Sequence, residues 1–218
     1  MTKCNVTNYN FQPVKGRRIE ASFNGGDVSS DGGSLLLREA DRSLDLTKRI
    51  ANILQDDRQK AKIQHSNRQI VRQRLYALAL GYEDLNDHDE LRKDPLFQTA
   101  VEQDQMLASA STLCRFENTA DRDRVLDMSE LLVNLFIESF DKPPEELVLD
   151  FDATDDIVHG MQAGRFYHGY YNHYCFLPLY VFCGSHLLAA YLRPSNQDPA
   201  KHSWAILSLL VRRFREEW

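Results

Sequence analysis

Two adjacent prolines, Pro143 and Pro144, divide the chain into two parts with different hydrophobic periods. Before them, apolar residues recur at intervals of three and four, the spacing of one face of an α-helix. After them, the segment ELVLDFDAT is short, apolar and bounded like a buried strand, and proline stops a preceding helix because it lacks a backbone donor. The sequence therefore predicts an α+β chain. The predicted divisions are an irregular or extended arm at residues 1–30, a mainly helical region at 31–142 and a sheet-containing region at 143–218.

Within the helical region, capping residues indicate where helices begin and end. Asp31 is expected to cap a first helix that breaks near Ser43. Ser66 is expected to cap a second helix, and Gly81 follows it as a C-terminal glycine does. Further helices are predicted in DELRKDPLFQTAVEQ, SASTLCRFEN and DRDRVLDMSELLVNLFIESF.

The region after Pro144 is predicted to hold three antiparallel strands and a helix. The first strand lies in ELVLDFDAT and is followed by a loop that carries Asp155 and Asp156. A single aromatic strand, YNHYCFLPLYVFCG, then turns into the strand HLLAAYLRPS. Asp198 is expected to cap, and Pro199 to open, a final helix that runs to Trp218.

Composition narrows the class of protein. The 218 residues are 43% hydrophobic and 27% charged, which suits a chain with a packed core. No apolar run is long enough to span a membrane and no leader precedes the chain, so a cytoplasmic protein is expected. The formal charge of −6 means that any DNA binding must come from local patches. Four cysteines lie far apart, which argues against a zinc site and a disulfide framework: Cys4, Cys114, Cys175 and Cys183.

Two carboxylates stand two residues apart on the first predicted strand. Side chains at this spacing face the same side of a strand, so Asp150 and Asp152 are expected to project together. Paired carboxylates attract a hard cation such as Mg²⁺, which prefers oxygen ligands. From the residues alone, an alternative of similar weight is that both side chains only point to water.

Several segments together resemble the insertion-sequence transposases of the thirteen-eighty family, whose catalytic domain has an RNase H-like fold with a DD-E carboxylate triad. The similarity covers most of the chain, with one departure at Ser195, where the family more often has glycine. The segments that carry it are VSSDGGSLLLREAD, GYEDLNDHDELRKDPLF, LASASTLCRFEN, LVLDFDATDDIVHGMQ, YHGYY and LRPSN.

The resemblance implies a site and a reaction. It identifies Asp152, which precedes Ala153-Thr154, as the first carboxylate of the triad, with Asp150 as a neighbour that shares or tunes metal binding. The implied cofactor is Mg²⁺ or Mn²⁺, and the implied partner is DNA at transposon ends, with a homo-oligomer possible. The family's second aspartate and its glutamate would follow Trp218. The 218 residues are therefore expected to be a truncated N-terminal part that neither binds metal productively nor cleaves DNA alone.

Two other functions remain open. The first is a non-enzymatic fragment that binds DNA or inhibits transposition. The second is a phosphatase of the haloacid dehalogenase type, because an apolar run followed by D-x-D-x-T also occurs there, with Asp150 as nucleophile and Asp152 as acid and base. That fold needs a parallel sheet and further downstream residues, whereas this sequence enters an aromatic hairpin.

Basic and aromatic residues supply weaker candidates for DNA contacts. Arg68, Arg72 and Arg74 are predicted to share a helix face opposite an apolar one, and a solvated face without DNA is the alternative. Arg193 can reach a phosphate or only anchor the Pro194 turn. Lys60, Lys62 and His65 lie just before the basic helix. Base stacking is the functional interpretation, and core packing the favoured one, for Tyr167, Tyr170, Tyr171 and Tyr174 with His168 and His173. No role follows from the sequence for the segment Arg115-Phe116-Glu117-Asn118.

Overall fold

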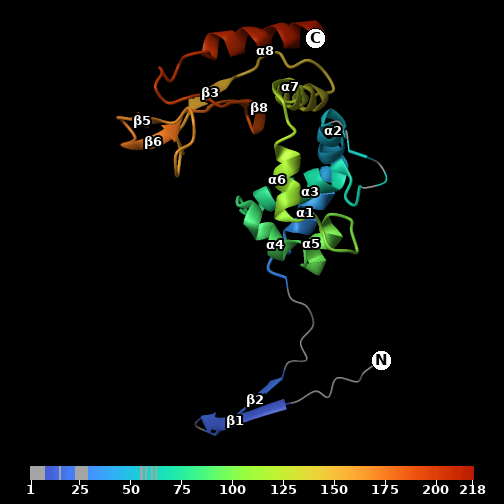
Figure 1. Cartoon of the computed structure of the whole chain (residues 1–218). Helices are drawn as coiled ribbons and strands as arrows, with labels where there is room; N and C mark the ends of the chain where they lie inside the picture. The colour runs from blue at the N-terminus through green and yellow to red at the C-terminus, as the bar shows by residue number, and fades with distance from the viewer. Residues whose placement is uncertain are drawn as a thin grey trace.

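The computed structural model of the protein describes residues 8–14, 16–22, 29–54, 56, 58, 59, 61 and 63–218, and Figure 1 shows its course. Helices and antiparallel sheets both occur, as an α+β chain requires. In the N-terminal arm, β1 (Asn8–Val14) pairs antiparallel with β2 (Arg17–Ser22). Of the two predictions for this segment, an extended arm and an irregular one, the described residues therefore agree with the extended arm. No described helix is both long and apolar enough to cross a membrane.

The helical region begins with two short helices, α1 (Ser34–Leu44) and α2 (Leu46–Ile53). The predicted break lies at Asp45, whose φ of 52° is left-handed and interrupts the helical path. The expected cap at Asp31 is wrong. Helix α1 starts at Ser34 after Gly33, without a side-chain cap, and the Asp31 carboxylate instead accepts a hydrogen bond from the Tyr82 hydroxyl at 3.0 Å.

Both predicted ends of the next helix, α3 (Asn67–Ala79), are confirmed. Ser66 and Gln69 form a capping box, which satisfies two of the backbone N–H groups that a helix start leaves unpaired. Gly81 follows the C-terminus with a φ of 92°, a conformation that favours glycine. The remaining short elements of this region are η2 (Leu85–Asp87), α4 (His88–Leu91), α5 (Pro95–Ala100) and α6 (Ala110–Glu117).

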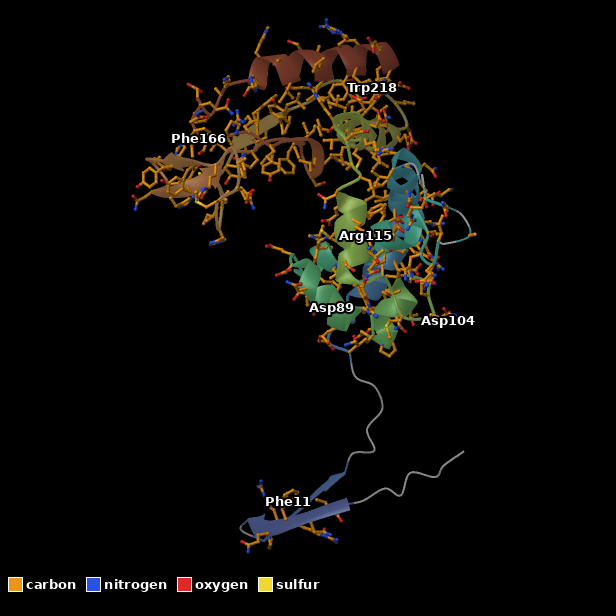
Figure 2. All side chains as sticks on the ribbon, in the orientation of Figure 1. Phe11, Asp89, Asp104, Arg115, Phe166 and Trp218 are labelled. Atoms are coloured by element: carbon orange, nitrogen blue, oxygen red, sulfur yellow. The ribbon has the colours of Figure 1, made fainter. Side chains whose placement is uncertain are left out.

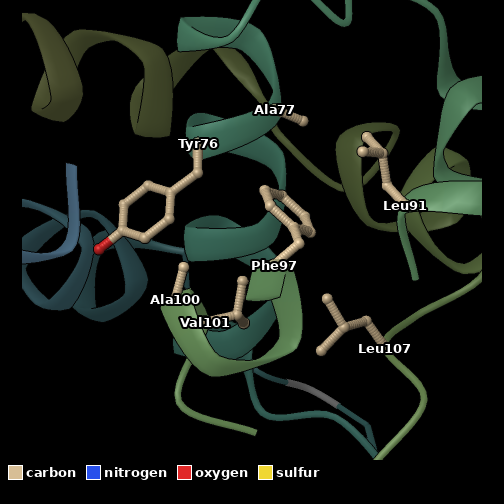
Figure 3. Packing of buried hydrophobic residues seen from close by; sticks show 7 residues of the cluster. All are labelled: Tyr76, Ala77, Leu91, Phe97, Ala100, Val101 and Leu107. Carbon is tan, nitrogen blue, oxygen red and sulfur yellow. The ribbon is translucent and has the colours of Figure 1, made fainter. Parts of the chain in front are cut away.

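The core of the helical region forms where α3 meets α4, α5 and the segment after α5. Phe97, Ala100 and Val101 are fully buried there, and Figure 3 shows them against Tyr76 and Leu107. A second, smaller cluster joins Ile70 of α3 to Leu113 of α6 and to Ala108, which lies just before α6. These contacts orient α6 relative to α3.

Helix α7 (Arg122–Glu138) packs with both parts of the chain. Its Phe136 is 1% exposed and lies in one cluster with Val181, Leu188, Leu210 and Phe214 from the sheet and the last helix. On its other side, Glu138 binds Arg49 of α2 through two hydrogen bonds of 2.8 and 2.7 Å. The predicted boundary at Pro143 follows the end of α7, but the buried face of α7 belongs to the core beneath the sheet that comes after it.

Two three-stranded antiparallel sheets follow α7. The first has the order β3 (Asp150–Ala153), β7 (Leu179–Cys183), β8 (His186–Tyr191). The second has the order β4 (Asp156–Ile157), β6 (His173–Phe176), β5 (Phe166–His168). Helix α8 (Ser203–Glu217) runs along the first sheet, with α7 beside β8 (Figure 1).

The structure corrects three details of the predicted strands and final helix. The single strand predicted over YNHYCFLPLYVFCG is two strands, β6 and β7, which belong to different sheets because Leu177-Pro178 separates them. The strand predicted in ELVLDFDAT is regular only from Asp150 to Ala153. Helix α8 begins at Ser203, four residues after Pro199, and the Asp198 carboxylate accepts from the Ala200 N–H at 2.7 Å in the turn before it.

The chain leading into β3 alternates between the core and solvent. Leu147, Leu149 and Phe151 pack against the cluster around Phe136, whereas Val148 is 73% exposed. Within the described residues, β3 pairs only with β7, so its other edge carries backbone groups without a strand partner.

We expect amide hydrogen exchange to report the absence of strand pairing in the segment that leads into β3. In a monomer, the amides of residues 147–149 should exchange at least about tenfold faster than the amide of Val181, which lies in the central strand of the same sheet. Exchange measured by mass spectrometry or NMR at several protein concentrations tests the prediction, since self-association through the edge would protect these amides. Equal protection in a verified monomer would show that another segment covers the edge.

Candidate functional site

The two carboxylates of β3 stand on its solvent-facing side. Asp150 and Asp152 are both exposed, and they pair across the sheet with Phe182 and Tyr180 of β7. The intervening Phe151 points the other way, into the core beside α7. Neither carboxylate has a hydrogen bond or an ion pair within the part of the chain that the structure describes. The alternation of a strand therefore holds two unneutralised negative groups on one face, as the sequence predicted.

A second acidic group, which sequence reasoning did not single out, lies near this pair. Asp155 follows β3 by two residues, and its Oδ2 lies 2.6 Å from Nε2 of His173 on β6. The ring of Tyr171 stacks on that of His173, with 6.0 Å between ring centroids and 25° between their planes. Burial raises the pKa of the Tyr171 hydroxyl, and the negative charges of Asp155 and Asp152 raise it further. Tyr171 therefore lies within the field of both carboxylates.

The carboxylates do not form a complete metal centre by themselves. No group of three or more His, Cys, Asp or Glu side chains that could hold an ion occurs among the described residues. Asp150 and Asp152 are nevertheless of the right chemical type for Mg²⁺ or Mn²⁺, because these ions prefer oxygen ligands and retain water molecules. The pair can contribute ligands to such a site, and further ligands would have to complete it.

Three tyrosines of the β5–β6 hairpin are not core residues, so the favoured core interpretation is wrong for these three, whereas Tyr171, His168 and His173 are partly buried. Tyr167, Tyr170 and Tyr174 are 53%, 85% and 48% exposed. The ring of Tyr174 meets that of Tyr167 edge to face at 5.6 Å, and the guanidinium of Arg165 lies 4.5 Å from its centroid. Only Cys175 of β6 is fully buried, because the hairpin is two-sided and its aromatic side faces solvent.

The three arginines of α3 do not form one exposed face. Arg72 is 2% exposed and lies in the core, where it binds Asp41 and Glu102 at 3.3 and 2.7 Å. The predicted phosphate contact of Arg72 is therefore wrong, and its removal would disturb the fold. The prediction that α3 has one apolar face and one basic face is wrong, because Arg72 forms its ion pairs on the buried side of the helix.

The other two arginines of α3 are partly covered. Arg74 is bound to Glu117 at 2.6 Å and donates to the carbonyl oxygens of Tyr82 and Glu83. Arg68 is partly exposed, so its contact with a DNA phosphate stays a prediction. Of the basic residues before α3, Lys60 and Lys62 lie outside the described residues, and His65 lines a pocket.

Arg193 anchors the chain instead of reaching outward. It is 1% exposed, its Nε donates to the carbonyl oxygen of Leu177 at 2.8 Å, and its Nη1 donates to those of Pro199 and Lys201 at 3.1 and 2.6 Å. Burial lowers its pKa. Arg193 thus ties the crossover between the two sheets to the loop before α8, and the suggested phosphate contact is replaced by this structural role.

The side chain of Ser195 has a structural role in this chain, although the family that the sequence resembles more often has glycine at this position. Its hydroxyl donates to the carbonyl oxygen of Phe166 at 2.9 Å and is almost fully buried. The turn after β8 is thereby tied to β5, which positions the second sheet beside the first.

Neither the curated proteins nor the solved structures gave a match. The family model described as "Transposase DDE domain group 1" matches residues 11–218, which is nearly the whole chain and includes β3 with its carboxylates. By that match, the chain belongs to the DDE transposase domains of group 1.

Proposed function

We propose that the protein is a transposase of the thirteen-eighty family, which acts in the cytoplasm on the DNA of transposon ends. The single observation that carries the proposal is the position of Asp152, exposed and unpaired among described residues on β3, within the LDFDAT motif. In this proposal, the sheet β3-β7-β8 with α8 is the first part of an RNase H-like core. The antiparallel order of these strands, followed by a helix that packs on them, supports the proposal.

Asp152 and Asp150 would hold a divalent cation together with further ligands. A bound Mg²⁺ or Mn²⁺ supplies charge stabilisation and nucleophile activation for phosphoryl transfer. The exposed faces of both carboxylates leave room for water molecules and a phosphate oxygen. The Asp155–His173 pair, at 2.6 Å, would orient Tyr171 at the edge of this site.

The alternatives are less well supported. A haloacid dehalogenase-type phosphatase needs a parallel sheet around its aspartates, whereas β3 pairs antiparallel with β7. A non-enzymatic protein that binds DNA remains the second candidate, because the described residues contribute only one pair of adjacent carboxylates toward a metal site. Oligomerisation through the open edge of β3 is compatible with either candidate.

Metal binding tests the assignment of Asp152. Mn²⁺, added in the millimolar range, should broaden the amide NMR signals of Asp150–Ala153 and of the neighbouring Tyr171 before those of other segments, because a paramagnetic ion relaxes nearby nuclei. Asp152→Asn should remove most of this selective broadening. The matched control is Asp127→Asn, which removes an exposed carboxylate from α7 and should leave the broadening unchanged. Equal broadening in all three proteins would exclude a site at β3.

The 218-residue chain by itself is expected not to cleave or join transposon-end DNA in Mg²⁺ or Mn²⁺. Two-metal phosphoryl transfer holds its ions about 3.5–4 Å apart, and one pair of adjacent carboxylates does not supply enough ligands to fix two ions. Incubation of the purified chain with a labelled duplex measures this directly. Metal-dependent nicking that disappears in Asp152→Ala would contradict the expectation and would at the same time establish Asp152 as catalytic.

A further inference from the structure

Two adjacent tyrosines, Tyr170 and Tyr171, lie in the turn that joins β5 to β6, and their rings meet edge to face with 5.0 Å between the centroids. Tyr170 is 85% exposed, and within the described residues its only ring contact is with Tyr171. Figure 2 labels Phe166 at the start of β5, on the hairpin that carries this turn. Exposed apolar surface that gathers at one place on a protein marks a binding site more often than single exposed residues do.

The contacts of Tyr171 hold this turn against the end of β3. Tyr171 is half-buried, its ring is stacked with that of His173, and the ring of His168 lies 4.9 Å from it, tilted by 43°. His173 is held in turn by Asp155, which follows β3 by two residues. The position of Tyr171 is therefore set by its neighbours, whereas the ring of Tyr170 beside it is open to a ligand.

The tyrosine turn, defined as residues 169–172, also lies beside Asp152. Burial raises the pKa of the Tyr171 hydroxyl, and the charges of Asp155 and Asp152 raise it further, so the ring stands within the electrostatic reach of both carboxylates. Tyr180 of β7 is the direct partner of Asp152 across the sheet, so more than one tyrosine lies close to this carboxylate. In the proposed function a DNA phosphate lies at Asp152, and neighbouring nucleotides follow about every 3.4 Å along the strand, so they come close to these rings.

Charge favours a nucleotide strand over a protein surface as the occupant of this turn. Asp150 and Asp152 have no partner in the described part of the chain. A protein surface that covered the rings and the carboxylates together would bury two uncompensated negative charges unless it supplied cations of its own. A DNA strand avoids this cost, since its phosphates bind the same divalent cation that the carboxylates attract.

We propose that Tyr170 and Tyr171 form a stacking surface for an unpaired base of the DNA strand whose phosphate lies at Asp152. The inference rests on the proposed function, because that function places the phosphate there. Every base has a π-face, so aromatic side chains bind single-stranded DNA with little dependence on its sequence. In a duplex these faces are covered by neighbouring bases, so the base must lie at a strand end or be swung out of the helix. A protein partner that covers the turn is the competing occupant and is an outcome of the test.

Fluorescence anisotropy with labelled single-stranded oligonucleotides of about ten nucleotides, in Mg²⁺ and about 50 mM salt, tests the proposal. A second oligonucleotide has the same phosphates but lacks its bases, so it cannot stack. The wild-type chain should bind the base-bearing strand at least about tenfold more tightly than the abasic strand. Tyr170→Ala should lower this preference at least about threefold, and the double variant Tyr170→Ala, Tyr171→Leu should reduce it to less than about twofold. The double variant Tyr170→Phe, Tyr171→Phe keeps both rings and should keep the preference.

Tyr191→Ala is the matched control. Tyr191 is 45% exposed and its ring lies 5.5 Å from that of His202, so it is another exposed tyrosine beside a histidine. It pairs with Leu179, which pairs with Ala153 of β3, so its side chain lies on the opposite face of the sheet from Asp152. This variant should change the preference for base-bearing DNA by less than about twofold.

The outcomes separate this inference from the proposed function. Equal affinity of the wild-type chain for both oligonucleotides, or a preference that survives in Tyr170→Ala, Tyr171→Leu, would overturn the stacking surface. No binding to either oligonucleotide would also overturn it and would favour a protein partner. The Mn²⁺ response of β3 is measured without DNA, so a failure of the proposed metal site is recognised independently of what the rings bind. Because Tyr170 is exposed and lies outside the core, thermal unfolding of Tyr170→Ala should match that of the wild type.

Discussion

Replacement of Asp41 by alanine is expected to lower the free energy of unfolding by about 3–5 kcal/mol, because it would remove one of the two carboxylate partners of the buried Arg72 guanidinium and leave other buried donors without their acceptor. Both side chains are nearly inaccessible, at 4% and 3% exposure. Asp41 also accepts bonds from the Thr47 N–H and hydroxyl, at 2.7 and 2.6 Å, and from the Tyr76 hydroxyl at 3.2 Å. One carboxylate therefore joins α1, α2 and α3.

Urea unfolding followed by far-ultraviolet circular dichroism measures this effect, with two comparison variants. Asp41→Asn keeps hydrogen-bond acceptors and should lose less than Asp41→Ala. The double variant Asp41→Leu, Arg72→Met removes both charges, so it should recover part of the loss, since a buried pair replaced by apolar residues is often close to neutral. Glu102, which also binds Arg72 at 2.7 Å, limits that recovery. A loss below about 1 kcal/mol for Asp41→Ala would show that water reaches Arg72.

Acidification is expected to destabilise the helical region well before its carboxylates are protonated. His88 is fully buried, and its burial lowers its pKa from 6.5 to about 4. An unfolded chain binds a proton at this residue near pH 6.5, whereas the folded protein does not, so stability falls as the pH drops from about 6.5 to about 4. The difference of about 2.5 pKa units corresponds to about 3 kcal/mol across this window.

The free energy of unfolding at intervals between pH 7 and pH 4 measures the slope, and His88→Gln should flatten it. A second loss of stability is expected at lower pH, where Glu102 becomes protonated. The hydrogen bond from Arg72 holds the pKa of Glu102 below its usual value, so the stability that Glu102 contributes is present above pH 4.5 and is lost as the pH falls through its folded pKa. If His88→Gln and the wild type lose stability equally between pH 6.5 and pH 5, another group is responsible for the decrease.

The local features of this fold were determined by the sequence. The Ser66 capping box, the glycine that ends α3 and the helix break near Asp45 depend on backbone bonds within a few residues, so local residue types suffice to predict them. The shared face of Asp150 and Asp152 follows from the alternation of a strand. The resemblance to a DDE transposase likewise rests on segments spread over most of the chain, and the family match over residues 11–218 confirms that coarser assignment.

The tertiary structure decided which charged and aromatic residues are available for function. Arg72 and Arg74 lie two residues apart on the same helix, yet only Arg72 is fully buried. It is buried because Asp41 and Glu102, each about 30 residues away in the sequence, meet it in the core. Asp155 directly precedes β4 and His173 begins β6. Their contact therefore depends on the pairing of β4 with β6, two strands that β5 separates in the sequence. Such contacts join residues distant in sequence, and no local period encodes them.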